Sequence, residues 1–497
     1  MSIHAQLSPE AQARLDAMKR NSTITSIIIA FLSLVLIGLL LAFIAIAPFL
    51  QETPVIVTYS ASVPTEEVLE TKKVSTNSKQ KPSAPSASSA KVIAAATASN
   101  VAIPVPEVDM AQPTTDFGNG DDFGDGWGSG GDGGGGGGGF GAIPATMRKR
   151  CSKEDRLQRL SETGGTEQCE DAVLKALRWM KQTQNPDGSW GQSNKAAMTG
   201  LGLLAYLGHC ETPLSEEFGD SCLKAITFLV NLGMKDGKLA QNFGGHGWVY
   251  EHSIAVYALA ESTTFCKQLG ITVPNLPEVT QKAGQVLIDG QHKNGGWAYG
   301  YDATSNAHTD VSVTGWHLQA LKAMKHTGLD FKNLSHTASK GLRYIEDKQA
   351  DDGGFGYNGK GHHAGLSYYT LTGVGVLCFQ MWDKGSSSQV RRGAKYISKN
   401  TKLKWGAPEC DLYGHYYEAQ AMMHRGGQEW KKYNDMFRDE VLRNQNSDGS
   451  WKSPDGQLRA VGAQFQGEGA QSVFYRTALC TLMLEVYYRF LPGTGSH

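Results

Sequence analysis

The chain has 497 residues, of which 40% are hydrophobic and 19% are charged, and its formal net charge at pH 7 is -1. This balance gives no whole-chain attraction to nucleic acid, and no basic cluster lies on a recognisable nucleic-acid motif, so nucleic acid is not an expected partner. The eight cysteines are scattered and include no Cys-x-x-Cys pair, which argues against a disulfide scaffold and against a zinc ribbon.

An apolar stretch near the start of the chain predicts a membrane span. Residues 24–50 are almost wholly apolar, and no charged residue occurs between Arg20 and Glu52. Such a stretch is long enough to cross a hydrocarbon core of roughly 30 Å as a helix. A cleaved signal peptide with its site at residues 45–47 is the alternative, but the apolar run is too long and Pro48 would follow the cut. We therefore predict an uncleaved helix over residues 23–50.

Basic residues lie on only one side of this predicted span. Arg14, Lys19 and Arg20 precede it, whereas the first basic residue after it is Lys72. By the positive-inside rule, residues 1–22 are expected in the cytosol and the rest of the chain outside it, in the periplasm if the organism is bacterial. The sequence thus predicts a single-pass membrane protein with an extracytoplasmic domain.

Residues 51–166 lack the composition of a folded domain. Ser, Ala, Pro, Lys and Thr dominate residues 64–111, and residues 118–141 are nearly continuous glycine interrupted mainly by Asp and aromatic residues. Such a segment buries too little apolar surface to offset the entropy of ordering its backbone. We interpret it as a disordered tether, with docking to an envelope protein partner as the alternative.

A short pattern recurs about every fifty residues in the second half of the chain, which indicates a repeat architecture. The spacing Q-x-x-x-G-x-W occurs at 184–190, 291–297 and 445–451, and at 349–355 with Phe in place of Trp. Two looser copies contain Trp248 and Trp405. The predicted structural residues of the repeat are Gln184, Trp190, Trp248, Gln291, Trp297, Gln349, Phe355, Trp405, Gln445 and Trp451.

An amphipathic helix is predicted before each copy and a more apolar helix after it. Helices of the first kind have one apolar and one charged face, at 169–183, 221–232, 277–290, 334–348, 388–398 and 430–443. Helices of the second kind are rich in apolar and small residues, as expected of buried helices, at 196–207, 253–259, 313–324, 366–381, 416–423 and 473–490. Between them, turn residues with positive φ lead to an aromatic side chain that covers the helix end. We predict two concentric rings of helices, because no terminal repeat shows the polar cap that an open solenoid requires.

This repeat closely resembles that of squalene and hopene cyclases and of protein prenyltransferase β subunits. The resemblance rests on the Q-x-x-x-G-x-W units with their inner and outer helices, over about residues 167–488. It implies an all-α fold, the α6/α6 toroid of the terpenoid cyclase type, for a domain that we place at 167–492. It also implies a deep central cavity at the N-terminal ends of the inner helices. The resemblance is more specific for fold than for chemistry.

Polar residues at the starts of the predicted inner helices are candidates for chemistry, because a closed ring makes them converge. Helix N-termini carry free N–H groups, so their shared mouth would favour anionic groups. The predicted catalytic residues are Asp310, Asp411, His415 and His363. The predicted ligand-binding residues are Tyr250, His252, His308, His362, Tyr368, Tyr413 and Tyr416, with Glu251, Tyr369 and Glu418 in the same positions. Asp310 and Asp411 also fit as ordinary N-caps.

The motifs that carry chemistry in proteins with this repeat are missing or altered. The D-x-D-D acid of the cyclases does not occur. In the segment that resembles the prenyltransferase zinc site, His415 comes one place late after Asp411, and Ser312 stands where a Cys would follow Asp310. The Cys-Gly-Glu-Gln thioester of complement-type toroids is absent as well. No cofactor is therefore predicted, and zinc is not supported.

Two classes of function remain open, together with a structural role in an envelope complex. The first is a binding module whose aromatic and His-lined cavity takes an apolar, isoprenoid-like or lipid-like, or else polymeric ligand. The second is an enzyme of isoprenoid cyclase or transferase type, or of polysaccharide lyase type, that uses the Asp, His and Tyr cluster as acid and base. An extracytoplasmic location disfavours prenyl diphosphates, which are made in the cytosol.

Two cysteines flank the start of the predicted toroid. Cys151 and Cys169 are expected either to pair outside the cytosol or to remain free thiols.

Overall fold

The computed structural model describes residues 58–59, 91–92, 94–95 and 150–489, apart from 244–246, 302–307, 363–368, 408–409 and 455–465. These residues belong to one compact unit, Val57–Ser83 with Ala90–His497. The predicted membrane span and most of the predicted tether lie outside the described residues. The end of the predicted tether was placed too late, because Lys153–Thr163 form a helix that begins with a Ser152 cap. Among the helices in the described ranges, none is long and apolar enough to cross a membrane.

Outer and inner helices alternate along the chain, as the sequence pattern predicts. The outer helices are α5 (Glu167–Thr183), α7 (Gly219–Gly233), α9 (Leu276–Asp289), α11 (Leu334–Glu346), α13 (Ser388–Asn400) and α15 (Gly427–Arg443). The inner helices are α6 (Lys195–Gly208), α8 (Trp248–Gln268), α10 (Val311–Thr327), α12 (Thr372–Met381), α14 (Leu412–Arg425) and α16 (Ala470–Leu484). Two further helices, α4 (Lys153–Thr163) and α17 (Val486–Arg489), stand outside the alternation and pack on each other.

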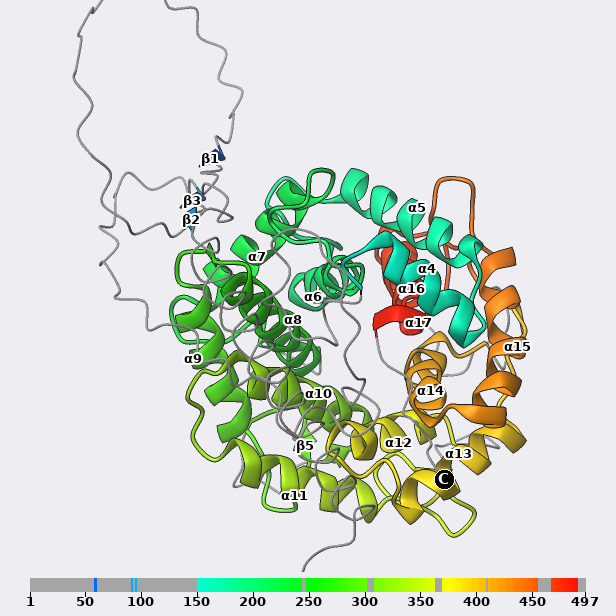
Figure 1. The fold of residues 1–497 in the computed structure, drawn as a ribbon. Helices are drawn as coiled ribbons and strands as arrows, with labels where there is room; N and C mark the ends of the chain where they lie inside the picture. Colours follow the sequence, from blue (N-terminus) through cyan, green and yellow to red (C-terminus); the bar gives the residue numbers. More distant parts are fainter. Residues whose placement is uncertain are drawn as a thin grey trace, which may run out of the picture. The chain divides into compact units, whose positions relative to one another are not determined.

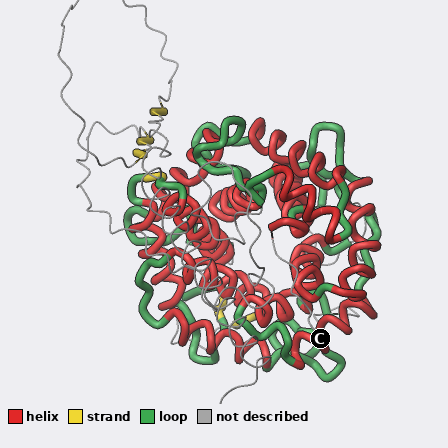
Figure 2. The backbone as a smooth tube through the Cα atoms, viewed as in Figure 1, coloured by secondary structure: helices red, strands yellow, loops and turns green. Residues whose placement is uncertain are grey.

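The inner helices contact one another all the way round a closed ring. α6 packs on α8, α8 on α10, α10 on α12, α12 on α14 and α14 on α16, and α16 returns to α6. In the outer layer, α15 packs against α5, which joins the last repeat to the first. Figure 1 shows the two concentric layers, and Figure 2 shows that loops connect them. The predicted all-α toroid is therefore confirmed.

Strands are few and short in the described part of the chain. β1 (Thr58–Tyr59) pairs in parallel with β3 (Ala94–Ala95), and β2 (Lys91–Val92) pairs in parallel with β4 (Ile271–Thr272). The antiparallel pair β5 (Trp297–Ala298) and β6 (Thr309–Asp310) sets Trp297 opposite Asp310. This last pairing holds the start of α10 against the turn of its own repeat, the third.

Inner and outer helices differ in burial, which explains their sequence patterns. Every residue of α12 is buried, whereas α13 buries only one face. Small residues permit this close packing. A Cβ atom on Gly202 of α6 would lie 3.0 Å from the Trp190 ring, so glycine lets the aromatic side chain rest on the helix backbone.

The Gln of each complete repeat unit joins its own turn to the next outer helix. The Gln184 amide donates to the Gly188 carbonyl at 2.9 Å and to the Ser221 carbonyl at 3.0 Å. Gln291 and Gln349 do the same with their own turns and with α11 and α13. In the last repeat, the Gln445 amide donates to the Ala172 carbonyl of α5 at 2.8 Å, which closes the ring.

The aromatic residue of each complete unit is a buried plug between the two layers. Trp190, Trp297 and Trp451 are 0% exposed, and each indole N–H donates at 2.8 to 2.9 Å to a carbonyl of the preceding outer helix. The turn glycine makes this buried position of the aromatic residue possible. Gly188 has φ of 85°, and a Cβ there would lie 2.5 Å from the Lys224 carbonyl oxygen of the next outer helix.

The second repeat uses different residues from those predicted. Gly237 has φ of 76° and approaches the backbone of Lys282 in α9, as the other turn glycines approach their outer helices. The plug position two residues later is Leu239, which is 0% exposed. Trp248 was predicted as this aromatic, but it is instead the first residue of α8. The prediction was wrong because a leucine carries no recognisable signal for the plug.

Candidate functional site

A cluster of hydroxyl groups and one carboxyl lies where the N-terminal ends of α8, α10 and α14 meet. We call it the Asp310 site, and it consists of Tyr250, Tyr299, Asp310, Ser312, Tyr357 and Tyr413.

Local pairing and ring closure bring these residues together from four repeats, the second to the fifth. Asp310 ends β6 and caps α10, because its carboxylate accepts the Val313 N–H at 2.8 Å. Tyr299 follows β5, the partner strand of β6. The Val311 N–H donates to the Tyr357 carbonyl at 2.8 Å, which brings the turn of the fourth repeat to the same place.

Hydrogen bonds link the hydroxyl groups of this site. The Tyr250 hydroxyl donates to Ser312 Oγ at 3.1 Å, and Ser312 Oγ lies 2.6 Å from the Tyr413 hydroxyl. The Tyr299 and Tyr357 hydroxyls also hydrogen-bond to each other. Tyr250, Tyr299 and Tyr357 are half-buried, so the site has both a hydrogen-bonded interior and an accessible aromatic rim.

The carboxyl of Asp310 is poised for proton exchange near neutral pH. The residue is 0% exposed, and burial raises its pKa to about 6, although the Val313 N–H and the Tyr357 hydroxyl act to lower it. A carboxyl with such a pKa can accept or give up a proton under ordinary conditions.

A second buried carboxyl holds the equivalent position on α14. Asp411 caps that helix by accepting the Gly414 N–H at 3.2 Å, and burial raises its pKa to about 6. Each aspartate stands two residues before one member of the Ser312–Tyr413 pair. The two caps are therefore tied together through one hydroxyl contact.

Two of the predicted site histidines point away from this cluster. His415 Nδ1 lies 2.9 Å from the Tyr433 hydroxyl of α15, and its Nε2 lies 3.2 Å from the Lys402 carbonyl. His252 Nε2 lies 3.1 Å from the Ala283 carbonyl of α9. Both imidazoles face the outer helices, so their assignment to a shared catalytic or ligand site was wrong. An inner helix has sides facing both layers, and the sequence does not show which side carries the histidine.

Of the remaining predicted residues in the described ranges, some lie at the rim of the Asp310 site and others lie away from it. His308 is exposed and stacks on Tyr299 with 6.3 Å between ring centroids, which puts it at the edge of the Asp310 site. His362 instead packs on Tyr369 at 4.2 Å, and Tyr369 packs on Tyr396 of α13. His363 and Tyr368 lie outside the described residues.

Two predicted acidic residues support the inner ring. Glu251 accepts the Ala196 N–H of α6 at 3.1 Å, and burial raises its pKa to about 7. Glu418 accepts the Thr401 hydroxyl at 2.9 Å, and burial raises its pKa to about 8. Each carboxyl thus satisfies a neighbouring donor of the scaffold.

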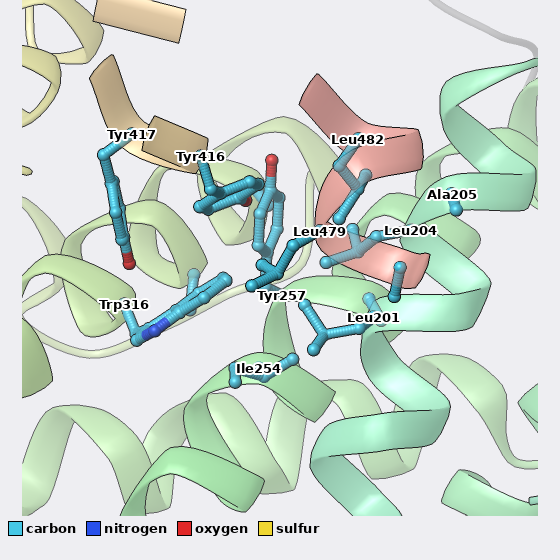
Figure 3. Packing of buried hydrophobic residues seen from close by; sticks show 14 of the residues in the cluster. Leu201, Leu204, Ala205, Ile254, Tyr257, Trp316, Tyr416, Tyr417, Leu479 and Leu482 are labelled. Carbon is cyan, nitrogen blue, oxygen red and sulfur yellow. The ribbon is translucent and has the colours of Figure 1, made fainter. Parts of the chain in front are cut away.

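Aromatic side chains occupy the ring interior one helical turn beyond the Asp310 site. Trp316 of α10 stacks on Tyr416 of α14 with 5.4 Å between centroids, and Tyr417 and Tyr257 lie beside them (Figure 3). Because α10 and α14 flank α12 in the ring, the stack passes across the interior. Tyr416, predicted to bind ligand, therefore belongs to this core layer. The resemblance implies a deep central cavity. Because these aromatic side chains occupy the interior, the Asp310 site instead lies at the end of the ring.

Charged side chains and a disulfide hold the opposite end, where the inner helices finish. Arg489 of α17 lies 3.2 Å from Glu261 of α8, and Arg150 lies 3.6 Å from the same carboxylate. Cys151 is disulfide-bonded to Cys210, directly after α6. The suggested pairing of Cys151 with Cys169 is wrong, because Cys169 is a buried free thiol.

Within the ranges that the structure describes, there is no group of three or more His, Cys, Asp or Glu side chains that could hold a metal ion.

Sequence reasoning missed Tyr299 and Tyr357, although the repeat contains a signal for them. Both stand two residues after a plug aromatic, Trp297 and Phe355. In both cases this residue lies beside Asp310 at the N-terminus of α10.

Comparisons with known proteins assign this chain to no family. No family model matches the chain, and no curated protein matches it. The type II terpene cyclase MstE from Scytonema is 12% identical over 64% of this chain and 98% of its own, with a TM-score of 0.40. An α-1,6-mannanase from Salegentibacter is 12% identical over 64% of this chain and 98% of its own, with a TM-score of 0.46. These values are too low to bear on activity, and the specific cyclase or prenyltransferase relationship stays a prediction.

Proposed function

We propose that this chain is a membrane-tethered, extracytoplasmic binding protein whose Asp310 site takes a hydroxyl-rich, polymeric ligand of carbohydrate type. The observation that carries the proposal is the hydroxyl chain from Tyr250 through Ser312 to Tyr413 beside a buried carboxyl.

The chemistry of the lining favours a sugar over an isoprenoid. Every aromatic of the site is a tyrosine, and its hydroxyl takes part in a hydrogen bond. An apolar chain could not use the hydrogen-bonding capacity that these hydroxyls and the Asp310 carboxylate still have, and removing water from them costs free energy. Sugar hydroxyls can donate to the Asp310 carboxylate and exchange bonds with the tyrosines, while the half-buried rings offer faces for the C–H surface of a sugar.

Location supports the same class of ligand. The span predicted over residues 23–50 and the tether after it would hold the toroid at a cell-envelope surface, outside the cytosol. Polysaccharides are abundant at such a surface.

An enzyme acting on the same ligand is the second candidate. It is favoured by one arrangement: Asp310 and Asp411 are buried carboxyls, each two residues before one member of the hydrogen-bonded Ser312–Tyr413 pair, and burial raises the pKa of both to about 6. Cleavage of a glycosidic bond usually needs a pair of carboxyls, one protonated to act as acid and the other ionised to act as base or nucleophile.

Calorimetry on the full chain in detergent tests the proposal. The probes are cellohexaose, maltohexaose and mannohexaose, with geranylgeraniol as the apolar probe. We expect a hexasaccharide to bind and Asp310→Asn to weaken it about tenfold or more, as for a lost charged hydrogen bond. Tyr206→Phe is the matched control, because the Tyr206 hydroxyl donates to the Leu177 carbonyl away from the site.

Three outcomes of this experiment separate the candidates. Binding of geranylgeraniol alone would overturn the carbohydrate assignment. Release of new reducing ends that stops in Asp310→Asn and Asp411→Asn would favour the enzyme. Absence of binding by every probe would leave a structural role in an envelope complex as the better reading.

A further inference from the structure

A pocket of about 500 Å³ opens between the turns of the fifth and sixth repeats. We call it the Trp405 pocket, and it is lined by Trp405, Gly406, Asn446, Lys452, Ser453 and Glu468. Its volume lies within the range of roughly 300–1,000 Å³ that is usual for small-molecule sites. The turns that form it lead into α14 and α16, so it lies at the same end of the ring as the Asp310 site.

Trp405, predicted as the aromatic of the fifth repeat, does not serve as a plug in the way that the tryptophans of the complete units do. Trp190, Trp297 and Trp451 are fully buried and bond their indole N–H to an outer helix, whereas Trp405 is half-buried. Among the described residues, its indole N–H has no hydrogen-bond partner. The Trp405 backbone N–H donates to the Glu440 carboxylate of α15 at 2.6 Å, which fixes the turn while the ring lines the pocket.

The facing wall is held in place by a buried arginine. Arg476 of α16 is 0% exposed, and its guanidinium donates to the Trp451 carbonyl at 2.6 Å and to the Glu468 carboxylate at 3.0 Å. Ser453, which is 8% exposed, accepts the Gly467 N–H at 2.8 Å. Arg476 and Ser453 thus hold the segment that carries the exposed Glu468 side chain before any ligand arrives, which lowers the entropy cost of binding.

The lining has the composition of a sugar subsite. One indole is combined with an amide, a hydroxyl, an ammonium and a carboxylate, from Asn446, Ser453, Lys452 and Glu468. An apolar ligand would desolvate two opposite charges, and a strongly anionic ligand would meet Glu468. A neutral sugar ring can stack on the indole and exchange hydrogen bonds with all four polar groups.

We propose that the Trp405 pocket is a second saccharide subsite, so that the ligand is an oligosaccharide extending from the Asp310 site across the fifth repeat. This inference rests on the proposed function for the class of ligand. Asp411 connects the two sites, because it caps α14 a few residues after Trp405 and stands two residues before Tyr413 of the Asp310 site.

Calorimetry with saccharides of increasing length tests the second subsite in the full chain. The probes are the mono-, tri- and hexasaccharides of the glucose and mannose series. In Trp405→Ala we expect hexasaccharide affinity to fall about tenfold, as for the loss of one stacking contact, while monosaccharide affinity changes less than about twofold. Trp405→Phe keeps an aromatic ring and should restore most of the affinity.

Controls and outcomes distinguish the two proposals. Trp179→Ala, at a half-buried tryptophan of outer helix α5, should leave binding unchanged. A hexasaccharide that depends on Asp310 but binds equally to wild type and Trp405→Ala overturns the subsite alone. A hexasaccharide that depends on Trp405 but not on Asp310 overturns the proposed function and leaves the pocket as the primary site. Absence of saccharide binding in the wild type overturns both.

Discussion

Ser312 Oγ lies 2.6 Å from the Tyr413 hydroxyl, and this contact joins the first turns of α10 and α14 across the face of α12. The two helices belong to the third and fifth repeats, which are about a hundred residues apart in the chain. The contact therefore depends on ring closure, and it positions the two aspartate caps relative to each other.

The cap and the charge of Asp310 can be separated by substitution. Asparagine is as good an N-cap as aspartate, so Asp310→Asn should keep the stability of the fold while it removes the titrating carboxyl. Asp310→Ala loses both, and we expect it to be about 1 kcal/mol less stable than Asp310→Asn. Urea unfolding of the three proteins measures this difference. Equal stability of the two variants would show that the cap is dispensable.

The buried carboxyl of Glu418 makes the free energy of unfolding depend on pH between about 4.5 and 8. Burial raises the pKa of Glu418 to about 8 from 4.5, so above pH 4.5 the folded state keeps a proton that the unfolded state has lost. The free energy of unfolding should therefore fall as pH rises toward 8. We expect Glu418→Gln to remove a slope of about 1 kcal/mol per pH unit between pH 7 and 8. Glu216→Gln, on an exposed loop, is the control, and an unchanged slope in Glu418→Gln would refute the assignment.

The disulfide between Cys151 and Cys210 should stabilise the toroid. It closes a loop with a sequence separation of 59, and loss of such a link usually costs about 2–4 kcal/mol. We expect Cys151→Ser and Cys210→Ser to lower the free energy of unfolding by similar amounts. Because they remove the same bond, the double variant should be no less stable than either single one. Additive losses in urea unfolding would contradict this pairing.

Trp297 and Trp405 offer a direct contrast between a plug and a pocket residue. Trp297→Ala empties a fully buried site and should cost about 3–5 kcal/mol of stability. Trp405→Ala removes a half-buried ring and should cost roughly 1 kcal/mol. Thermal unfolding by circular dichroism compares the two. Similar losses would mean that Trp405 is a plug like the others.

The repeat could be predicted because its residues act locally. The Gln, Gly and aromatic residue of each complete unit make the same contacts within the unit at the same sequence spacings. The same residue types therefore recur wherever this local geometry recurs. In the second repeat the plug position is occupied by Leu239, which is not one of these recurring residue types, so the pattern does not show it. The bounds of α8 were also missed, since a helix buried on nearly all sides shows no amphipathic period.

The site was predicted only in part for a related reason. A closed ring makes inner-helix N-termini converge, which is how Tyr250, Asp310 and Tyr413 could be found. The direction of each side chain round its helix depends on packing. His252 and His415 therefore looked like site residues in the sequence, although they hold the outer layer.

The most direct test of the Asp310 site is a structure of the full chain in detergent with the hexasaccharide that binds it most tightly. We predict a sugar ring whose hydroxyls contact the Asp310 carboxylate and the Tyr413 hydroxyl, at the end of the ring where the inner helices begin. A ligand bound anywhere else on the toroid, with the Ser312–Tyr413 cluster unoccupied, would contradict the proposed function.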